Sequence, residues 1–246
     1  MLPLHYNHII QGFIYKNLSS SLAESLHNQG SRFEKRQFKL FTFSRLFGSF
    51  DRRASNIAFR GPLYLWLASP LVKILESFAS HLIKKGKVKV GNSYLQPASV
   101  EVSFDEQFKS PVLVRTLSPI TVYSTLRTAD GRHKTYYYSP FEEDFSRLIE
   151  ENLLKKRTIL KNNLSQANFD ETVLSNAKKT EAFKIRPEKV SNRNQHILFF
   201  KGTIIKAWSG LYRLEGSPEL IKIAFDCGLG SKNSQGFGMI EKYESK

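Results

Sequence analysis

The feature of this sequence that most restricts its fold is an order of helix-like and strand-like segments that recurs in its two halves. Apolar residues at helical spacing and runs of β-favouring residues give the first half a helix, two strands, a second helix and a strand. The predicted segments are a helix over 6–18, a short helical piece over 21–30 with a capping box at Ser21-x-x-Glu24, a hairpin of 38–47 with 57–67, a helix over 69–85, and strands at 87–90 and 99–104.

The second half repeats this order and adds a strand before its first helix. The predicted segments are a strand over 112–123, a helix over 140–160, strands at 182–185 and 196–214, a helix opened by Ser217-Pro218 and reaching 226, and a strand over 236–243, with the polar stretch 160–180 as a loop or linker. This is the order of a βαββαβ ferredoxin-like unit used twice. The sequence predicts an α+β protein with domains 1–111 and 112–246, in which the first unit has a missing or very short opening strand.

Charge and cysteine content narrow the function classes. The 246 residues include 37 Lys plus Arg against 22 Asp plus Glu, and the excess of +15 is shared by both halves. Such a balance favours polyanionic partners, of which nucleic acid and anionic membranes are the usual candidates. The single Cys227 excludes an intramolecular disulfide and a Cys-rich zinc site, and it favours a cytoplasmic location. The N-terminus lacks a secretory signal, and the most apolar stretch, 62–72, is too short to span a membrane.

The densest motif lies near the C-terminus, where four glycines bracket a polar, basic centre. Glycine allows positive φ and close approach to a ligand, and free N–H groups in such a loop can hold phosphate oxygens. A helix C-cap followed by a loop explains about two of the four. A Rossmann fingerprint, a Walker A loop and the octapeptide of an RNA-recognition motif each fail on one or more positions. The candidate RNA-binding residues here are Gly228, Gly230, Lys232, Asn233, Ser234, Gly236 and Gly238.

The eleven residues 228–238 resemble, without a gap, the G-h-G-x-x-x-x-x-G-h-G loop of CRISPR-associated endoribonucleases that process pre-crRNA, the Cas6-type branch of the RAMP superfamily. Residues 4–8, 11–15, 38–44 and 117–120 are similar to the same family. The resemblance implies tandem ferredoxin-like domains and a metal-independent cut of CRISPR repeat RNA without a cofactor. In that reaction a 2′-hydroxyl attacks the adjacent phosphate, and the products carry a 2′,3′-cyclic phosphate and a 5′-hydroxyl.

Such a reaction needs a base, an acid and a positive charge beside the phosphate. Tyr15, His27 and Lys39 lie where many family members place a tyrosine, a histidine and a lysine. By family analogy His27 is the acid and Lys39 stabilises the crowded phosphate. A tyrosine with an ordinary pKa of about 10 is a poor base, so we expect Tyr15 to orient the 2′-hydroxyl. On one unbroken helix Tyr15 and His27 would point about 120° apart, so a catalytic pairing requires a break near residues 19–21.

Plainer interpretations accompany these assignments. A lone histidine near a helix end often satisfies backbone carbonyls. Arg36, with Lys35, is a further RNA-binding candidate that could replace Lys39. The tyrosines of 136–138 suit base stacking and a half-buried strand equally well. Basic clusters at 32–36, 52–53, 84–89 and 127–134 are ordinarily solvated faces, but together they suggest a path for an RNA backbone.

Two other functions remain open at this stage. The first is a non-catalytic RAMP-type RNA-binding protein or a subunit of a CRISPR effector complex, with a homodimer also open. The second is a general nucleic-acid-binding protein, which leaves the fit of the glycine-rich segment to chance. The residues Tyr15, His27 and Lys39 favour the enzyme.

Overall fold

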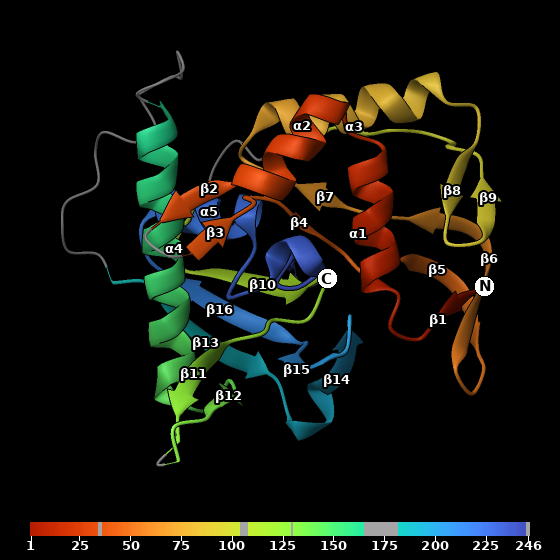
Figure 1. The fold of residues 1–246 in the computed structure, drawn as a ribbon. Coiled ribbons are helices and arrows are strands. Elements are labelled where there is room, and N and C mark those ends of the chain that lie inside the picture. The colour runs from red at the N-terminus through yellow and green to blue at the C-terminus, as the bar shows by residue number, and fades with distance from the viewer. Residues whose placement is uncertain (34–35, 104–107, 129, 165–181, 245–246) are drawn as a thin grey trace.

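A computed structural model describes residues 1–33, 36–103, 108–128, 130–164 and 182–244. The chain forms two α+β units, one from each half, which lie side by side (Figure 1). The C-terminal segment, in blue, is drawn between α4 (Glu143–Leu164) on the left and α1 (Asn7–Lys16) on the right. The last part of the chain therefore lies between the two halves.

The N-terminal unit has a three-stranded sheet of order β1-β6-β5, and α1 and α3 pack beside it. The opening strand β1 is shortened to two residues, which pair with β6. The break between the first two helices is present, because α1 ends at Lys16 and α2 begins at Ser20. The elements are β1 Leu2–Pro3, α1 Asn7–Lys16, α2 Ser20–Glu24, the π-helix η1 Ser25–Gln29, β2 Ser31–Phe33, β3 Arg36–Phe38, β4 Thr42–Phe43, β5 Phe47–Arg52, β6 Asn56–Tyr64, β7 Leu67–Ala68, α3 Val72–Lys84, β8 Val88–Val90 and β9 Ser93–Leu95.

Three details of the first half differ from the prediction. The capping box at Ser21 is wrong, because α2 already begins at Ser20 and Ser21 lies inside it; Ser19 is the N-cap and makes no side-chain cap bond, and its backbone N–H donates to Ser77 Oγ of α3 at 2.9 Å. The long strand over 38–47 is replaced by the short β4 and by β5, which begins at Phe47. Residues 99–103 form no strand, since β8 pairs with the adjacent β9 through a turn at Gly91.

The C-terminal unit has the complete ferredoxin-like sheet, of order β13-β16-β10-β17. All its neighbouring strands are antiparallel, and α4 and α5 pack against it. The helix α5 begins where Ser217-Pro218 predicts, with Ser217 Oγ accepting from Leu220 N at 3.3 Å. The elements are β10 Val112–Thr116, β11 Tyr123–Arg127, β12 His133–Tyr137, α4 Glu143–Leu164, β13 Lys184–Lys189, the 3-10 helix η3 Asn192–Asn194, β14 Gln195–Phe200, β15 Thr203–Trp208, β16 Leu211–Glu215, α5 Pro218–Cys227, the 3-10 helix η4 Asn233–Gln235 and β17 Ile240–Lys242.

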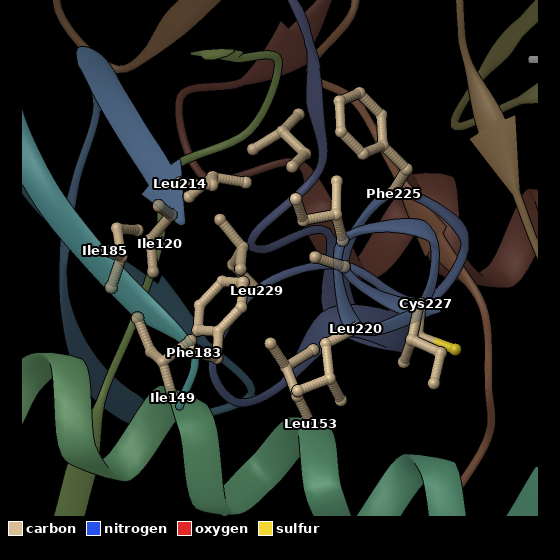
Figure 2. Packing of buried hydrophobic residues seen from close by; sticks show 14 of the residues in the cluster. Ile120, Ile149, Leu153, Phe183, Ile185, Leu214, Leu220, Phe225, Cys227 and Leu229 are labelled. Atoms are coloured by element: carbon tan, nitrogen blue, oxygen red, sulfur yellow. The ribbon is translucent and has the colours of Figure 1, made fainter. Parts of the chain in front are cut away.

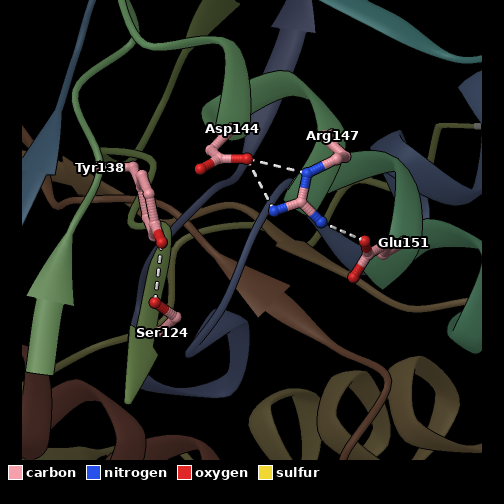
Figure 3. Close-up of polar contacts among 5 residues, drawn as sticks. All are labelled: Ser124, Tyr138, Asp144, Arg147 and Glu151. Carbon is pink, nitrogen blue, oxygen red and sulfur yellow. Dashed lines mark hydrogen bonds and ion pairs between the residues drawn. The ribbon is translucent and has the colours of Figure 1, made fainter. Parts of the chain in front are cut away.

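Two hairpins, β11–β12 and β14–β15, are added to this unit. They divide the long strands predicted over 112–123 and 196–214, the second one through a Lys201-Gly202 turn with positive φ at both residues. The hydroxyls of Ser124 and Tyr138 share a hydrogen bond of 2.8 Å beside the first hairpin (Figure 3). The helix α4 runs to residue 164, beyond the predicted start of the linker at 160, and residues 165–181 lie outside the described part.

The core of the C-terminal unit is formed where the two helices meet the sheet. Ile149 and Leu153 of α4 point toward Phe183, Leu220 of α5 and Leu229 (Figure 2). The opposite face of α4 is polar, and Arg147 forms ion pairs with Asp144 and Glu151 on it (Figure 3). This amphipathic pattern fixes which side of α4 faces inward.

Candidate RNA-binding and catalytic site

The glycine loop, residues 228–238, connects α5 to β17 and is tightly packed against both halves. Its four glycines all have positive φ. A Cβ atom at Gly238 would lie 2.0 Å from Leu229 O, and one at Gly236 would lie 2.6 Å from the Phe43 ring. Contacts within the protein thus require glycine at these positions, which is more than the C-cap interpretation explained. RNA contact by Gly228, Gly230, Gly236 and Gly238 stays a prediction.

Side chains from several elements hold the carbonyl oxygens of the glycine loop. Asn7 of α1 donates to Gln235 O and Gly236 O at 2.9 and 3.0 Å, and Gln11 donates to Ser234 O at 2.7 Å. Thr42 of β4 donates to Phe237 O at 3.1 Å. Because α1 and β4 belong to the first half, the loop joins the two halves through hydrogen bonds.

Tyr15 lies on the same face of α1 as Asn7 and Gln11, the two residues that hold the loop, because positions 7, 11 and 15 are four residues apart. Its ring packs edge-on against the buried Phe41, with ring centroids 6.0 Å apart. Its hydroxyl is buried and has no hydrogen-bond partner among the described residues. Burial raises the pKa of Tyr15 to about 12. At neutral pH the group is a protonated donor, which agrees with an orienting role rather than that of a base.

Lys39 lies beside Tyr15, with Nζ 5.3 Å from the centroid of the Tyr15 ring. Burial lowers the pKa of Lys39, and the charge of Lys201 lowers it further. No carboxylate in the described part of the chain forms an ion pair with either lysine. Lys201 lies in the β14–β15 turn, so the second half brings another cation toward the site. Sequence analysis missed Lys201, although Lys201-Gly202 between two apolar runs is a turn signal.

His27 is placed apart from this pair. It is exposed on η1, and its Nδ1 lies 3.0 Å from Asn28 Oδ1. The neighbouring Leu26 is buried in the same core as Phe41, so η1 is anchored while His27 faces solvent. Among the described contacts none joins His27 to Tyr15 or Lys39. The structure thus brings two of the three predicted catalytic residues together.

Of the remaining predicted residues, one lies on β3 and the others lie in the glycine loop. Arg36 is exposed on β3, three residues before Lys39, while Lys35 lies outside the described residues. Lys232 has φ 60° and places its Nζ 5.0 Å from the centroid of the Tyr123 ring, and burial lowers its pKa. Asn233 donates to Leu229 O and Phe237 O, at 2.9 and 3.0 Å, and closes the glycine loop on itself. Ser234 is half-buried.

The tyrosines of 136–138 are engaged within the protein through their hydroxyls. Tyr137 donates to Ile204 O and Tyr136 donates to Glu142, each at 2.8 Å, while Tyr138 pairs with Ser124. Within the described ranges there is no group of three His, Cys, Asp or Glu side chains suited to hold a metal ion. The helices described there include none with the length and apolar character to cross a membrane.

Comparison with known proteins identifies the family. Residues 1–99 match the sequence model of CRISPR-associated protein Cas6, N-terminal, and residues 99–242 match that of CRISPR associated protein Cas6, C-terminal. The chain is 29% identical to a protein of Methanocaldococcus jannaschii named CRISPR-associated endoribonuclease Cas6 1, over 100% of this chain and 89% of that protein. It is 26% identical to CRISPR-associated endoribonuclease Cas6 of Pyrococcus furiosus, over 98% and 83%.

A solved structure of a CRISPR associated protein Cas6 superposes with a TM-score of 0.74 at 26% identity, covering 99% of this chain and 93% of that one. The tandem ferredoxin-like fold predicted from the element order is confirmed by this likeness and by the sheet order of the second unit. Both halves match, so the assignment does not depend on the glycine loop alone. The chain belongs to the Cas6 family of CRISPR-associated proteins.

Proposed function

We propose that the protein is an endoribonuclease that cuts CRISPR repeat RNA in pre-crRNA to give mature crRNA, without a metal ion. Its membership of the Cas6 family and the names of its relatives support a crRNA-processing endoribonuclease. The observation that carries the chemistry is a buried Tyr15 hydroxyl with no partner in the described part of the protein, beside the cation of Lys39. The Lys39 cation lies over the Tyr15 ring, so a donor and a positive charge come from one small region, which suits a phosphodiester that becomes more negative during reaction.

We assign the roles within this proposal, and that of His27 rests on family analogy. The 2′-oxygen attacks phosphorus, the bond from phosphorus to the 5′-oxygen breaks, and a 2′,3′-cyclic phosphate forms. Lys39 stabilises the extra negative charge, and Tyr15, whose pKa burial raises further above neutral pH, donates a hydrogen bond that orients the reacting group. His27 protonates the departing 5′-oxygen, while the proton of the 2′-hydroxyl passes to water. For His27 to act, the RNA must bridge from η1 to Lys39.

The RNA partner is held by the glycine loop and by the exposed cations of both halves. Lys232, Asn233 and Ser234 lie at the outer part of the loop, and Arg36 lies near Lys39. We assign the glycines a contact through backbone groups. The division into domains at residues 111 and 112, and a cytoplasmic location in line with the single free Cys227, belong to the same proposal.

One observation favours a second function, that of an RNA-binding protein or effector-complex subunit that does not cut. His27 is exposed and contacts neither Tyr15 nor Lys39 among the described residues. A protein of this kind, alone or as a homodimer, would bind repeat RNA and leave it intact.

Incubation with labelled repeat RNA in EDTA separates the two functions. The RNA is transcribed from the CRISPR array of the source genome. We expect cleavage with a cyclic-phosphate end, and we expect RNA with 2′-deoxyribose at the cut position to bind but remain whole. His27→Ala should slow cleavage by about 10² at nearly unchanged affinity, whereas His8→Ala, also exposed, should not. Intact RNA in a shifted band would favour the non-cutting protein.

A further inference from the structure

The proposed function gives no role to Lys156, a buried cation in the middle of α4. Its exposed fraction is 2%. A buried ammonium is costly unless hydrogen bonds replace its hydration. None of the ion pairs of the described residues includes Lys156, and the carboxylate of Glu219 on α5 lies 3.7 Å from Arg157 and from Lys161. The cation of Lys156 is therefore satisfied by neutral acceptors.

Those acceptors all belong to the glycine loop. Lys156 Nζ lies 2.7 Å from Gly228 O, 2.8 Å from Asn233 Oδ1 and 3.5 Å from Gly230 O. The carbonyl of Gly228 lies at the C-terminal end of α5, where the partial charge of the helix is negative. One ammonium group thus connects α4, the end of α5 and the polar centre of the loop.

The contact with Asn233 also fixes which way its side-chain amide points. Because Oδ1 accepts from Lys156, Nδ2 is directed to Leu229 O and Phe237 O on opposite sides of the loop. Removal of the ammonium would leave Asn233 Oδ1 and the Gly228 carbonyl without a donor in a buried place. The loop would then gain by rearranging toward water.

The charged and titratable groups around Lys156 do not supply a substitute. Cys227 is buried, and burial raises the pKa of its thiol to about 12, so it is neutral at physiological pH. Asp226 and Lys222 of α5 pair with each other at 2.8 Å. Burial lowers the pKa of Lys156 to about 8, which leaves it mostly protonated near pH 7.

We infer that Lys156 is a positioning residue for RNA: from inside the protein it holds the glycine loop in the shape that places residues 231–235 against the ribose-phosphate chain, without touching the RNA itself. The RNA part of this inference rests on the proposed function, whereas the hold on the loop does not. Removal of Lys156 should release the loop and weaken RNA binding while leaving the number of phosphate contacts unchanged.

The test compares Lys156→Met with Leu153→Ala, a buried change one turn away on the same helix. Leu153→Ala opens a cavity in the core that Leu229 shares, but it breaks no hydrogen bond to the loop. Hydrogen exchange is measured at the amides of Leu229, Gly236 and Gly238, which bond within the loop and to Pro119. We expect protection to fall at least tenfold more in Lys156→Met than in Leu153→Ala. Equal protection in the two variants would overturn the hold on the loop. Should Lys156→Met not fold, Lys156→Gln receives the same measurements.

Repeat-RNA affinity is then measured for both variants at a temperature where each is folded. We expect the Kd of Lys156→Met to rise at least tenfold with an unchanged slope against salt, and that of Leu153→Ala to stay within threefold. A phosphate-contacting lysine would instead reduce the slope by about 0.7. An unchanged Kd, or a reduced slope, would overturn the positioning role. If wild-type protein does not bind repeat RNA, the proposed function fails, and hydrogen exchange still decides whether Lys156 holds the loop.

Discussion

The two ferredoxin-like units differ in how regular their sheets are. The C-terminal unit keeps a four-stranded sheet and two helices over one core, and its glycine loop is held by hydrogen bonds on several sides. The N-terminal unit has a two-residue opening strand and several two- or three-residue strands, yet it supplies Tyr15, His27 and Lys39. Under the proposed function, the regular unit holds the RNA while the short segments of the other unit carry the residues that act on it. The comparison predicts that site changes in the first unit alter rate, and loop changes alter stability and affinity.

Lys39→Met should have the largest effect on rate. Because the Lys39 ammonium has no carboxylate partner among the described residues, its charge is available to a phosphate. Loss of one such charge should slow cleavage by about 10²–10³. Single-turnover cleavage at saturating protein measures this, and thermal unfolding should remain near wild type. Lys16→Met, at an exposed site on α1, is the control. A similar slowing in both variants would remove the special role of Lys39.

Gly238→Ala, in the glycine loop of the C-terminal unit, should lower stability. A Cβ atom there would lie 2.0 Å from Leu229 O, and the φ of 76° disfavours any L side chain. We expect a loss of about 3 kcal/mol in the free energy of unfolding, measured by urea titration. Gly12→Ala is the matched control, because no atom lies within 4 Å of its added Cβ and it sits inside α1. That change should stabilise by about 0.5–1 kcal/mol. A tolerated Gly238→Ala would mean that the loop is less tightly packed than its contacts indicate.

The sequence predicted the order of the elements better than their length. Ser217-Pro218 marked the start of α5 correctly because the cap is local, whereas Ser21 is not a cap because α2 begins one residue earlier, at Ser20. The strand over 38–47 was divided where β4 pairs with the distant β7, so a tertiary contact overrides local propensity there. The strand over 196–214 was divided by a local signal, the Lys201-Gly202 turn of the β14–β15 hairpin.

The site was predictable where a motif carried it and not where packing did. Tyr15 and Lys39 came from the family resemblance, and the structure places them together. Lys156 was hidden in the run 155–157, which is typical of a solvated face. A signal did exist, because position 156 continues the apolar stripe of Ile149, Leu153 and Leu160 on α4. A lysine on such a stripe must find buried acceptors.

The pH dependence of stability tests, with a smaller expected effect, whether the ammonium of Lys156 is buried in the C-terminal unit. The pKa of Lys156 is lowered by burial to about 8, below its unfolded value, so above pH 8 the unfolded state binds more protons. Stability from this group therefore rises with pH, by about 1.5 kcal/mol between pH 8 and 9.5. The free energy of unfolding is measured by urea titration for wild type and for Lys156→Met. Its difference between the two cancels the other titrating groups and gives the contribution of Lys156. A difference that stays flat over this range would mean that the ammonium is solvated.

Tyr15→Phe separates chemistry from folding at the smallest scale. The hydroxyl is buried without a partner in the described residues, so its removal takes away an unsatisfied polar group and should leave stability equal or slightly higher. Cleavage should still fall about tenfold, since the lost hydrogen bond is made only with RNA. Because burial raises the pKa of Tyr15 to about 12, the pH profile from 6 to 9 should keep its shape in the variant. A profile that loses a step would mean that Tyr15 ionises and acts as the base. An unchanged rate would mean that the catalytic centre does not include α1. The claim that changes at Tyr15 in the first unit alter the rate would then be wrong.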